Sequence, residues 1–363
     1  GQKDLENKII QAVGEPRERF QEDALRLMRA VRLATRLSFT IEKGTAEAVQ
    51  KQASLLEFIA KERIAEELSK LLMTENAAEG VESLQKLGLL RYVLAELEEG
   101  VDMEQNKHHK FTVFGHNVKS LAYAAEKNFP LHLRLASLLH DVGKPRARAW
   151  KNDPRGEKMR DGKKGDWTFY QHQYIGEKMA LEMLARLHYP KAMIEKIALL
   201  VREHMFVYDP EVVTERGVRR LVHRVGADNI DDLLLVREAD RIGSGVPKAQ
   251  PYRLRHLRAM IEKAKQAPLN PKMLKINGNE IMEISGIDSK SPQAPRIGKL
   301  LHILLDEVID DPKKNDNAVL RARVKELGKL SDQKLDALAA EAKESVKNVQ
   351  QRIDKAIMGK FFV

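Results

Sequence analysis

The amino-acid sequence predicts an all-α fold, mostly helical with at most one small hairpin, arranged as an elongated array of helical segments. Apolar residues recur at the 3.6-residue period of a helix through most of the chain. Aromatic residues make up only 5 % of the sequence, and runs of alternating β-branched residues, which are typical of strands, are rare. The 363 residues are enough for roughly two to three compact units.

Composition excludes several classes of protein. The chain has no cysteine, so disulfides, thiolate catalysis and cysteine-bound zinc are excluded, and any metal must be held by His, Asp or Glu. No apolar run approaches the roughly 18 residues that span a bilayer, and the first residues lack a signal-peptide core. We therefore expect no membrane contact and a cytoplasmic location. The formal net charge of +10 fits a polyanionic partner such as RNA.

The first strong helix is expected at about residues 18–38. Its apolar residues, among them Leu27 and Val31, fall on one face, and the opposite face carries Arg26, Arg29, Arg32 and Arg36. Short loops around glycine and asparagine separate this helix from others, which favours a packed array of helical hairpins. These further helices are expected at residues 45–53, 60–72, 77–87 and 90–97.

The middle of the chain continues as helices from residue 111 to about 265. A segment rich in Lys, Arg, Pro and Gly at residues 144–164 interrupts them, and we expect an exposed basic loop there, with a hairpin closing at residues 167–170. A Pro/Asn linker at residues 267–271 marks a boundary. Beyond it we expect a small helical module and then charge-rich helices. The predicted domains are residues 1–100, 101–266 and 267–363.

One group of histidines and aspartates has the pattern of a metal site. His140 and Asp141 are adjacent at the end of an apolar helix and are followed by Gly143, read as a turn, and Lys144. A single such histidine is usually a hydrogen-bonded core residue, but several metal-type ligands on separate predicted helices are a more specific signal. Imidazole and carboxylate ligands suit Mg²⁺, Mn²⁺, Ni²⁺, Fe²⁺, Co²⁺ or Zn²⁺ and do not choose among them. The other members of the group are His116, His172, His204 and Asp240.

The order of these residues resembles that of the HD phosphohydrolase superfamily. Four flanking segments, in the same order along the chain, make the sequence similar to the bacterial class II tRNA nucleotidyltransferase/poly(A) polymerase family. The resemblance covers about residues 4–312. The four segments are residues 20–32, 62–68, 168–172 and 275–282.

For the HD segment, the resemblance implies a metal-dependent phosphohydrolase of the 2′,3′-cyclic phosphodiesterase, 2′-nucleotidase or phosphatase type. Asp141 and Lys144 are the implied catalytic residues, and Lys144 would stabilise charge on the phosphate. The implied metal ligands are His116, His140, Asp141, His172, His204 and Asp240.

For the first long helix, the resemblance implies nucleotide selection. The family's EDxxR motif is present as Glu22, Asp23 and Arg26, and its Asp and Arg read the edge of CTP or ATP; Arg29 extends the expected nucleotide site. The i,i+3 spacing predicts that Asp23 and Arg26 lie on one face of the expected helix. The alternative is that Glu22 and Asp23 are simply favourable charges near a helix N-terminus. The implied partners are tRNA or another RNA, together with nucleotides. The basic stretch at residues 216–224, which includes His223, is one candidate surface for RNA phosphates.

The family's palm domain, with a Gly-Ser turn followed by an Asp-x-Asp pair, has no counterpart here, since no Asp-x-Asp occurs before Asp228. We therefore expect the sequence as given not to polymerise nucleotides, and expect truncation of a longer parent or a split or degenerate gene. The main hypothesis is an RNA-binding phosphohydrolase. The alternative is the RNA-binding, nucleotide-selecting half of a polymerase that needs a separate palm domain. A third hypothesis is a catalytically idle RNA-binding module.

Overall fold

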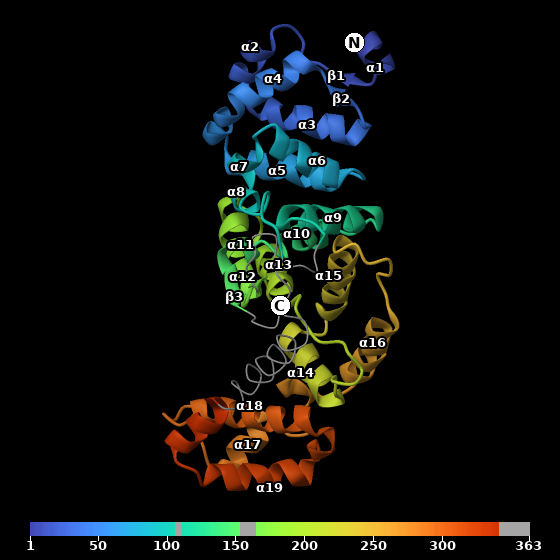
Figure 1. Ribbon diagram of the computed structural model, residues 1–363. Helices are drawn as coiled ribbons and strands as arrows, with labels where there is room; N and C mark the ends of the chain where they lie inside the picture. The colour runs from blue at the N-terminus through green and yellow to red at the C-terminus, as the bar shows by residue number, and fades with distance from the viewer. Residues whose placement is uncertain (106–109, 153–164, 341–363) are drawn as a thin grey trace. The chain divides into compact units, whose positions relative to one another are not determined.

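A computed structural model describes residues 1–105, 110–152 and 165–340 of the chain. The expectation of a mostly helical fold is confirmed, because the described residues form helices α1 to α19 and only four short strands (Figure 1). The chain divides into two compact units. The first comprises residues 1–205 and 231–249, and the second comprises residues 206–230 with the described residues from 250 onward. The predicted domain boundaries stay predictions.

The single helix expected at residues 18–38 is wrong. The structure has two helices, α2 (Pro16–Glu22) and α3 (Leu25–Leu37), separated by Asp23 and Ala24. Asp23 has an extended backbone, with φ −149° and ψ 99°, and its Oδ1 accepts a hydrogen bond from the backbone N–H of Leu25 at 3.2 Å. The break arises because an aspartate beside a helix start caps free N–H groups better than it continues a helix.

Helices α4 (Lys43–Gln52), α5 (Lys61–Leu72) and α6 (Ala77–Lys86) match the predicted segments to within two residues. Helix α3 packs against α5 and α6 through a fully buried apolar face. The helix expected at residues 90–97 is instead two single turns, α7 (Leu90–Val93) and α8 (Ala95–Glu98), which meet at Leu94.

A small parallel pair of strands near the start of the chain was not predicted from the sequence. It joins β1 (Ile9–Ile10), which follows α1 (Gln2–Glu6), to β2 (Thr40–Ile41). Each strand has only two residues, so it is too short to show an alternating pattern. The pair ties the segment before α2 to the segment after α3.

The candidate site lies in a second group of helices in the first unit. These are α9 (Val113–Glu126), α10 (Leu131–Leu139), α12 (His172–Arg186), α13 (Lys191–Glu203) and α15 (Ile230–Gly243). Leu135, Leu138 and Leu139 of α10 are fully buried, and α10 packs against α9 and α13.

A hairpin separates α10 from α12. After the single turn α11 (Lys144–Ala147), strand β3 (Ala149–Asn152) pairs in antiparallel register with β4 (Gly165–Thr168). The expected hairpin is therefore present, but it pairs over residues 149–168 and ends before residue 170. Residues 153–164 of the expected basic loop lie outside the described residues.

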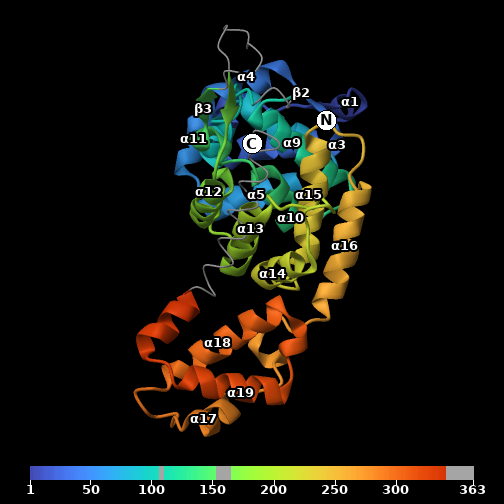
Figure 2. The ribbon, with the colours of Figure 1, turned by 60° about the horizontal axis from the view of Figure 1, so that its bottom comes forward.

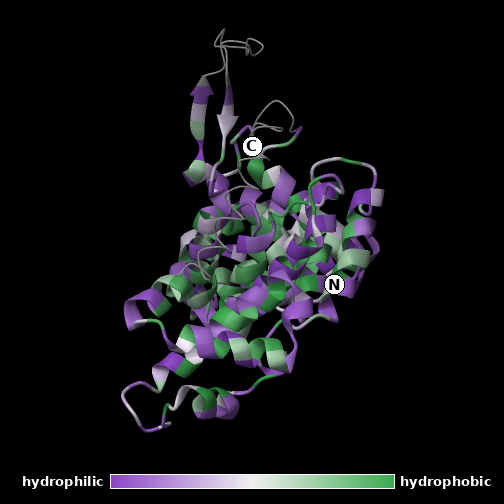
Figure 3. Cartoon of the chain, turned by 90° about the horizontal axis from the view of Figure 1, so that it is seen from below, coloured by the Kyte–Doolittle hydropathy of each residue, from purple (hydrophilic) through white to green (hydrophobic). Residues whose placement is uncertain are grey.

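The second unit contains α14 (Glu215–Val225), α16 (Tyr252–Lys265), α17 (Gly278–Ser285), α18 (Pro295–Asp310) and α19 (Asn317–Gly328). Helices α17, α18 and α19 pack around a core that includes Leu300 and Leu304 (Figure 2). Purple and green alternate along single helices in Figure 3, as expected for amphipathic packing. Among the described residues, no helix is both long enough and apolar enough to span a bilayer.

Candidate metal centre

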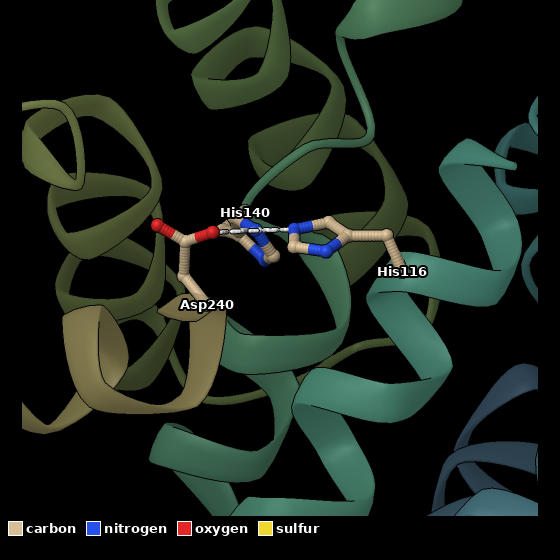
Figure 4. Close-up of side chains that lie close together, drawn as sticks. All are labelled: His116, His140 and Asp240. Atoms are coloured by element: carbon tan, nitrogen blue, oxygen red, sulfur yellow. Dashed lines mark hydrogen bonds and ion pairs between the residues drawn. The ribbon is translucent and has the colours of Figure 1, made fainter. Parts of the chain in front are cut away.

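The first of two side-chain clusters joins three helices. His116 comes from α9, His140 lies at the end of α10, and Asp240 comes from α15 (Figure 4). The Nε2 atoms of His116 and His140 are 2.8 Å apart, and Asp240 Oδ1 lies 3.3 Å from the first and 3.6 Å from the second. Both imidazoles are at most 1 % exposed. Potential ligand atoms from three distant segments thus converge on one buried point.

The second cluster lies directly beside the first and consists of Asp141, His172 and His204. His172 Nε2 is 3.3 Å from His204 Nε2, and Asp141 Oδ1 is 3.2 Å from His172 Nε2 and 3.5 Å from that of His204. The other carboxylate oxygen, Asp141 Oδ2, lies 3.2 Å from His116 Nε2 in the first cluster. Asp141 therefore bridges the two clusters, one oxygen to each.

The backbone fixes which nitrogen three of the histidines present. Nδ1 of His140, His172 and His204 lies 2.8, 2.7 and 2.6 Å from the carbonyl oxygen of the residue three positions earlier. A carbonyl only accepts, so Nδ1 carries a proton in each of the three rings, and Nε2 is the nitrogen whose lone pair can bind a metal when the ring is neutral. Two such lone pairs facing each other at 3.3 Å repel unless a cation lies between them. This arrangement fits a divalent metal, and the carbonyls act as the outer contacts that orient metal-binding histidines.

The environment of the two clusters shifts the pKa values of their histidines and aspartates. Burial alone would lower the pKa of His140, but the Asp141 and Asp240 carboxylates raise it to about 10. Burial lowers the pKa of His204 to about 4, and the neighbouring protonated His140 also lowers it. Although burial opposes ionisation of both aspartates, Lys144 holds the pKa of Asp141, and Arg237 that of Asp240, well below the usual range. The two aspartates are thus anionic at neutral pH and suit a divalent cation.

Two glycines let the ligand-bearing helices approach closely. A β-carbon at Gly143 would collide with the backbone oxygen of His172, and one at Gly243 would collide with the side chain of Ser120, one turn after His116. The interpretation of Gly143 as a turn is incomplete, because its φ of −79° is open to any residue. Its hydrogen side chain is required by the contact with α12.

A cavity of about 220 Å³ opens onto the second cluster. Asp141, His172, His204 and Asp240 form its inner wall, together with Lys144. Sequence reasoning missed two further lining residues, Arg237 and Arg241. On α15, Arg237 lies three residues before Asp240 and Arg241 lies one residue after it. A check for basic residues near Asp240 on this helix could therefore have found them.

Lys144 makes contacts that the sequence did not indicate. Its Nζ lies 2.7 Å from Asp141 Oδ2 and donates to Oε1 of Gln105 at the same distance, and the side chain is only 6 % exposed. In the structure Lys144 therefore contacts a bridging carboxylate rather than open space. The role expected for it, stabilising charge on a phosphate, stays a prediction.

The expected nucleotide site differs from the helix face that the sequence suggested. Arg26 Nη1 contacts Glu22 Oε2 at 2.7 Å, whereas Asp23 lies between the helices and contacts Arg63 at 3.3 Å and Arg29 at 3.8 Å. The idea that Asp23 and Arg26 share one helix face is therefore wrong, because α2 ends before Asp23. The four residues nevertheless lie together at the α2–α3 junction.

Arginines of α14, expected to face RNA phosphates, are engaged elsewhere in the second unit. Arg220 is 2 % exposed and pairs with Asp306 and Asp310 of α18, and Arg219 donates to the carbonyl oxygens of Ile309 and Asp310. His223, a second expected phosphate contact, bonds through Nδ1 to the Leu269 carbonyl at 2.7 Å. Cations near a helix C-terminus are favourable, which explains this arrangement without RNA.

Comparison with known proteins gives matches to two family models. A family model described as the probable RNA and SrmB-binding site of polymerase A matches residues 38–100, and one described as the HD domain matches residues 113–244. An A-adding tRNA nucleotidyltransferase of Deinococcus radiodurans is 34 % identical over 317 residues, 84 % of this chain and 68 % of that protein. A CC-adding tRNA nucleotidyltransferase of Thermus thermophilus is 30 % identical over 84 % of this chain and 66 % of its own length.

Among solved structures, the fold is similar to that of the Bacillus stearothermophilus CCA-adding enzyme, which was crystallised in complex with CTP. The TM-score is 0.59 at 22 % identity, over 90 % of this chain and 67 % of that chain. The chain spans about two thirds of the length of the relatives with which it aligns most fully. The level of identity shows a common fold with the CCA-adding enzyme and no more.

Proposed function

This chain belongs to the class II tRNA nucleotidyltransferase/poly(A) polymerase family, and from that premise we propose that it supplies RNA binding and nucleotide selection for tRNA nucleotidyl transfer. In this proposal it acts with a palm domain, either of the same protein or of another chain. The observation that carries the proposal is the continuous similarity to A-adding and CC-adding relatives across both family segments.

The α2–α3 junction offers suitable hydrogen-bonding groups for a base. The Arg26 side chain is 40 % exposed, and its guanidinium donates in a fixed planar fork that suits ring nitrogen and carbonyl acceptors. Asp23, 24 % exposed, accepts from an exocyclic amine. Their present partners are exposed ion pairs, which stabilise proteins weakly and can be exchanged for a ligand.

A reconstituted extension assay tests this function. With a competent palm domain, tRNA and radiolabelled CTP or ATP, the chain is expected to support addition, and Arg26→Ala is expected to reduce it about 10- to 100-fold, the range for a lost charged hydrogen bond. Arg19→Ala is the matched control, because Arg19 contacts the other oxygen of Glu22 and is similarly exposed. Equal activity of the Arg26 and Arg19 variants, or no extension with a palm that is active elsewhere, would contradict the proposal.

A second function, metal-dependent phosphoester hydrolysis, is supported by the two clusters that share Asp141. A divalent metal bound there would lower the pKa of a water molecule and polarise a phosphoryl oxygen. The chain's own residues would do the rest: Lys144 keeps Asp141 anionic and in place, and Arg237 and Arg241 add positive charge on the cavity wall, where a phosphate would enter.

Chelation and metal replacement test the hydrolase function. The purified chain is expected to hydrolyse a 2′,3′-cyclic nucleotide, to lose this activity in a strong chelator, and to regain it with Mn²⁺, Ni²⁺ or another divalent ion. Elemental analysis should find bound metal before chelation. Tight tRNA binding without metal uptake or hydrolysis would instead favour an idle RNA-binding module.

A further inference from the structure

The β3–β4 hairpin holds an aromatic surface that neither proposed function uses. Trp150 and Trp167 are the chain's only two tryptophans, and they lie directly opposite each other on the paired strands. Their ring centroids are 5.1 Å apart with an interplanar angle of 81°, and both side chains are only half-buried. The strands extend away from the helices (Figure 3). A two-stranded ribbon buries two such rings only in part, so part of the aromatic surface of each tryptophan stays accessible.

Basic side chains accompany these rings. The Arg148 guanidinium carbon lies 3.7 Å from the centre of the Trp167 ring, and Lys151 Nζ lies 6.0 Å from that of Tyr170. Within the described part of the chain, Arg148 has no hydrogen bond or ion pair, and its Nε is buried. Glu104 acts on its charge only from beyond ion-pair distance. The Arg148 guanidinium is therefore able to bind an anionic group of a ligand.

We propose that this hairpin binds single-stranded RNA, with unpaired bases stacking on Trp150 and Trp167 and backbone phosphates contacting Arg148 and Lys151. Aromatic faces combined with basic side chains are the usual means of holding single strands, because every base has a stacking face and every nucleotide carries a phosphate. The net charge of +10 favours the same class of ligand. Stacking requires unpaired bases, so the surface excludes a duplex interior.

The hairpin is joined at both ends to the candidate metal centre. Only Pro145, Arg146 and Ala147 separate Lys144, on the cavity wall, from Arg148, which limits that path to about 14 Å. On the other side, Phe169 follows β4, and its carbonyl orients His172. An RNA end held on the hairpin would therefore lie near the cavity. This last step rests on the proposed hydrolase function, whereas the binding itself does not.

Binding of a fluorescein-labelled 12-nucleotide RNA to the full chain, in chelator to prevent hydrolysis, tests the proposal. Anisotropy should show a Kd roughly 5- to 100-fold weaker for Trp167→Leu, the range for one lost base stack, and within about threefold of the parent for Trp167→Phe, which keeps a stacking face. Arg148→Ala should also reduce the slope of log K against log salt by about one. Arg146→Ala is the matched control, because Arg146 already pairs with Glu99.

Intrinsic fluorescence provides an independent readout, since both tryptophans lie in the hairpin. Unlabelled single strand should quench the emission of the parent chain, and a blunt duplex of the same length should not. Equal quenching by both, or parental affinity in Trp167→Leu, would overturn the proposal, as would equal losses in Trp167→Leu and Trp167→Phe. If binding behaves as expected but cyclic nucleotides are not hydrolysed, the hydrolase function fails and this inference stands.

Discussion

The candidate metal centre and the α2–α3 junction both consist of ionisable side chains, but those of the metal centre are buried and those of the junction are largely exposed. At the metal centre, His140 is fully buried and the Asp141 side chain is 3 % exposed. At the junction, the Glu22 and Arg26 side chains are 47 % and 40 % exposed. Buried polar groups must be satisfied within the protein, whereas exposed ones can exchange partners with water.

This difference in burial teaches what each region can do. The metal centre is preorganised, because carbonyls, Lys144 and Arg237 already fix its ligands. The junction is adaptable, because its ion pairs are weak and a nucleotide can replace them. We therefore expect substitutions at the metal centre to abolish metal binding. Substitutions at the junction should change nucleotide selectivity with little effect on folding.

The largest effect is expected for His140→Ala. It removes a ligand of the first cluster and leaves the Asp141 and Asp240 charges without that imidazole, so metal content and cyclic-nucleotide hydrolysis should fall by more than about 100-fold. Metal analysis and initial rates measure this, and circular dichroism checks the fold. His188→Ala is the control, since His188 is 59 % exposed and its nearest acid is Glu62. If the His140 variant hydrolysed the cyclic nucleotide at the rate of the parent, the metal centre would not be more sensitive to substitution than the junction.

The next effect concerns Glu67, a buried carboxylate that pairs with Arg29 and Arg32 of α3. Glu67 is 3 % exposed and accepts from Arg32 Nε at 2.6 Å. Glu67→Gln leaves Arg32 without its countercharge and should lower the free energy of unfolding by about 3 kcal/mol in urea denaturation. Glu79→Gln, at an exposed position of α6, should leave it unchanged. A loss below about 1 kcal/mol would mean that water solvates this pair as it does the exposed ones.

A smaller and pH-dependent effect is expected in the metal-free protein. The pKa of His140 is raised to about 10, so its stabilising contribution is full below its unfolded pKa near 6.5 and is lost as the pH rises toward 10. The pKa of His204 is lowered to about 4, so its contribution is lost as the pH falls from about 6.5 toward 4. Thermal unfolding in chelator should therefore show a maximum near pH 6.5.

His140→Gln should flatten the alkaline side of that profile and leave the acid side in place. The junction groups should not contribute to it, because exposed carboxylates titrate with small effects on stability. An unchanged alkaline slope in His140→Gln would show that another group causes it.

The smallest effect is expected for the stability of Arg26→Ala. Its contact with Glu22 is an exposed i,i+4 pair, so the denaturation midpoint should match that of the parent even though nucleotide addition falls. A clear drop in the midpoint would show that the junction is structural, and would weaken its assignment to nucleotide selection.

The sequence was sufficient to predict the helical class and the members of both clusters. Residue types at helix ends carry that signal, and the contact from each of three histidines to the carbonyl three residues earlier is local. The break at Asp23 could not be seen, because the apolar period runs through it and tertiary packing decides between capping and continuation. Gln105 was missed because its contact with Lys144 joins segments that are distant in the sequence. Arg237 lies only three residues before Asp240 on α15, so its helix spacing could have revealed it.

The close approach at Gly143 and Gly243 bears on which mutations the protein can tolerate. Neither residue offers a ligand atom, yet any β-carbon there must push α12 or α9 outward and carry His172 or His116 with it. A saturation library scored for metal retention should thus find these two glycines as intolerant as the histidines themselves. In such a library, the lack of a β-carbon at these two positions would prove as important for metal binding as the ligands.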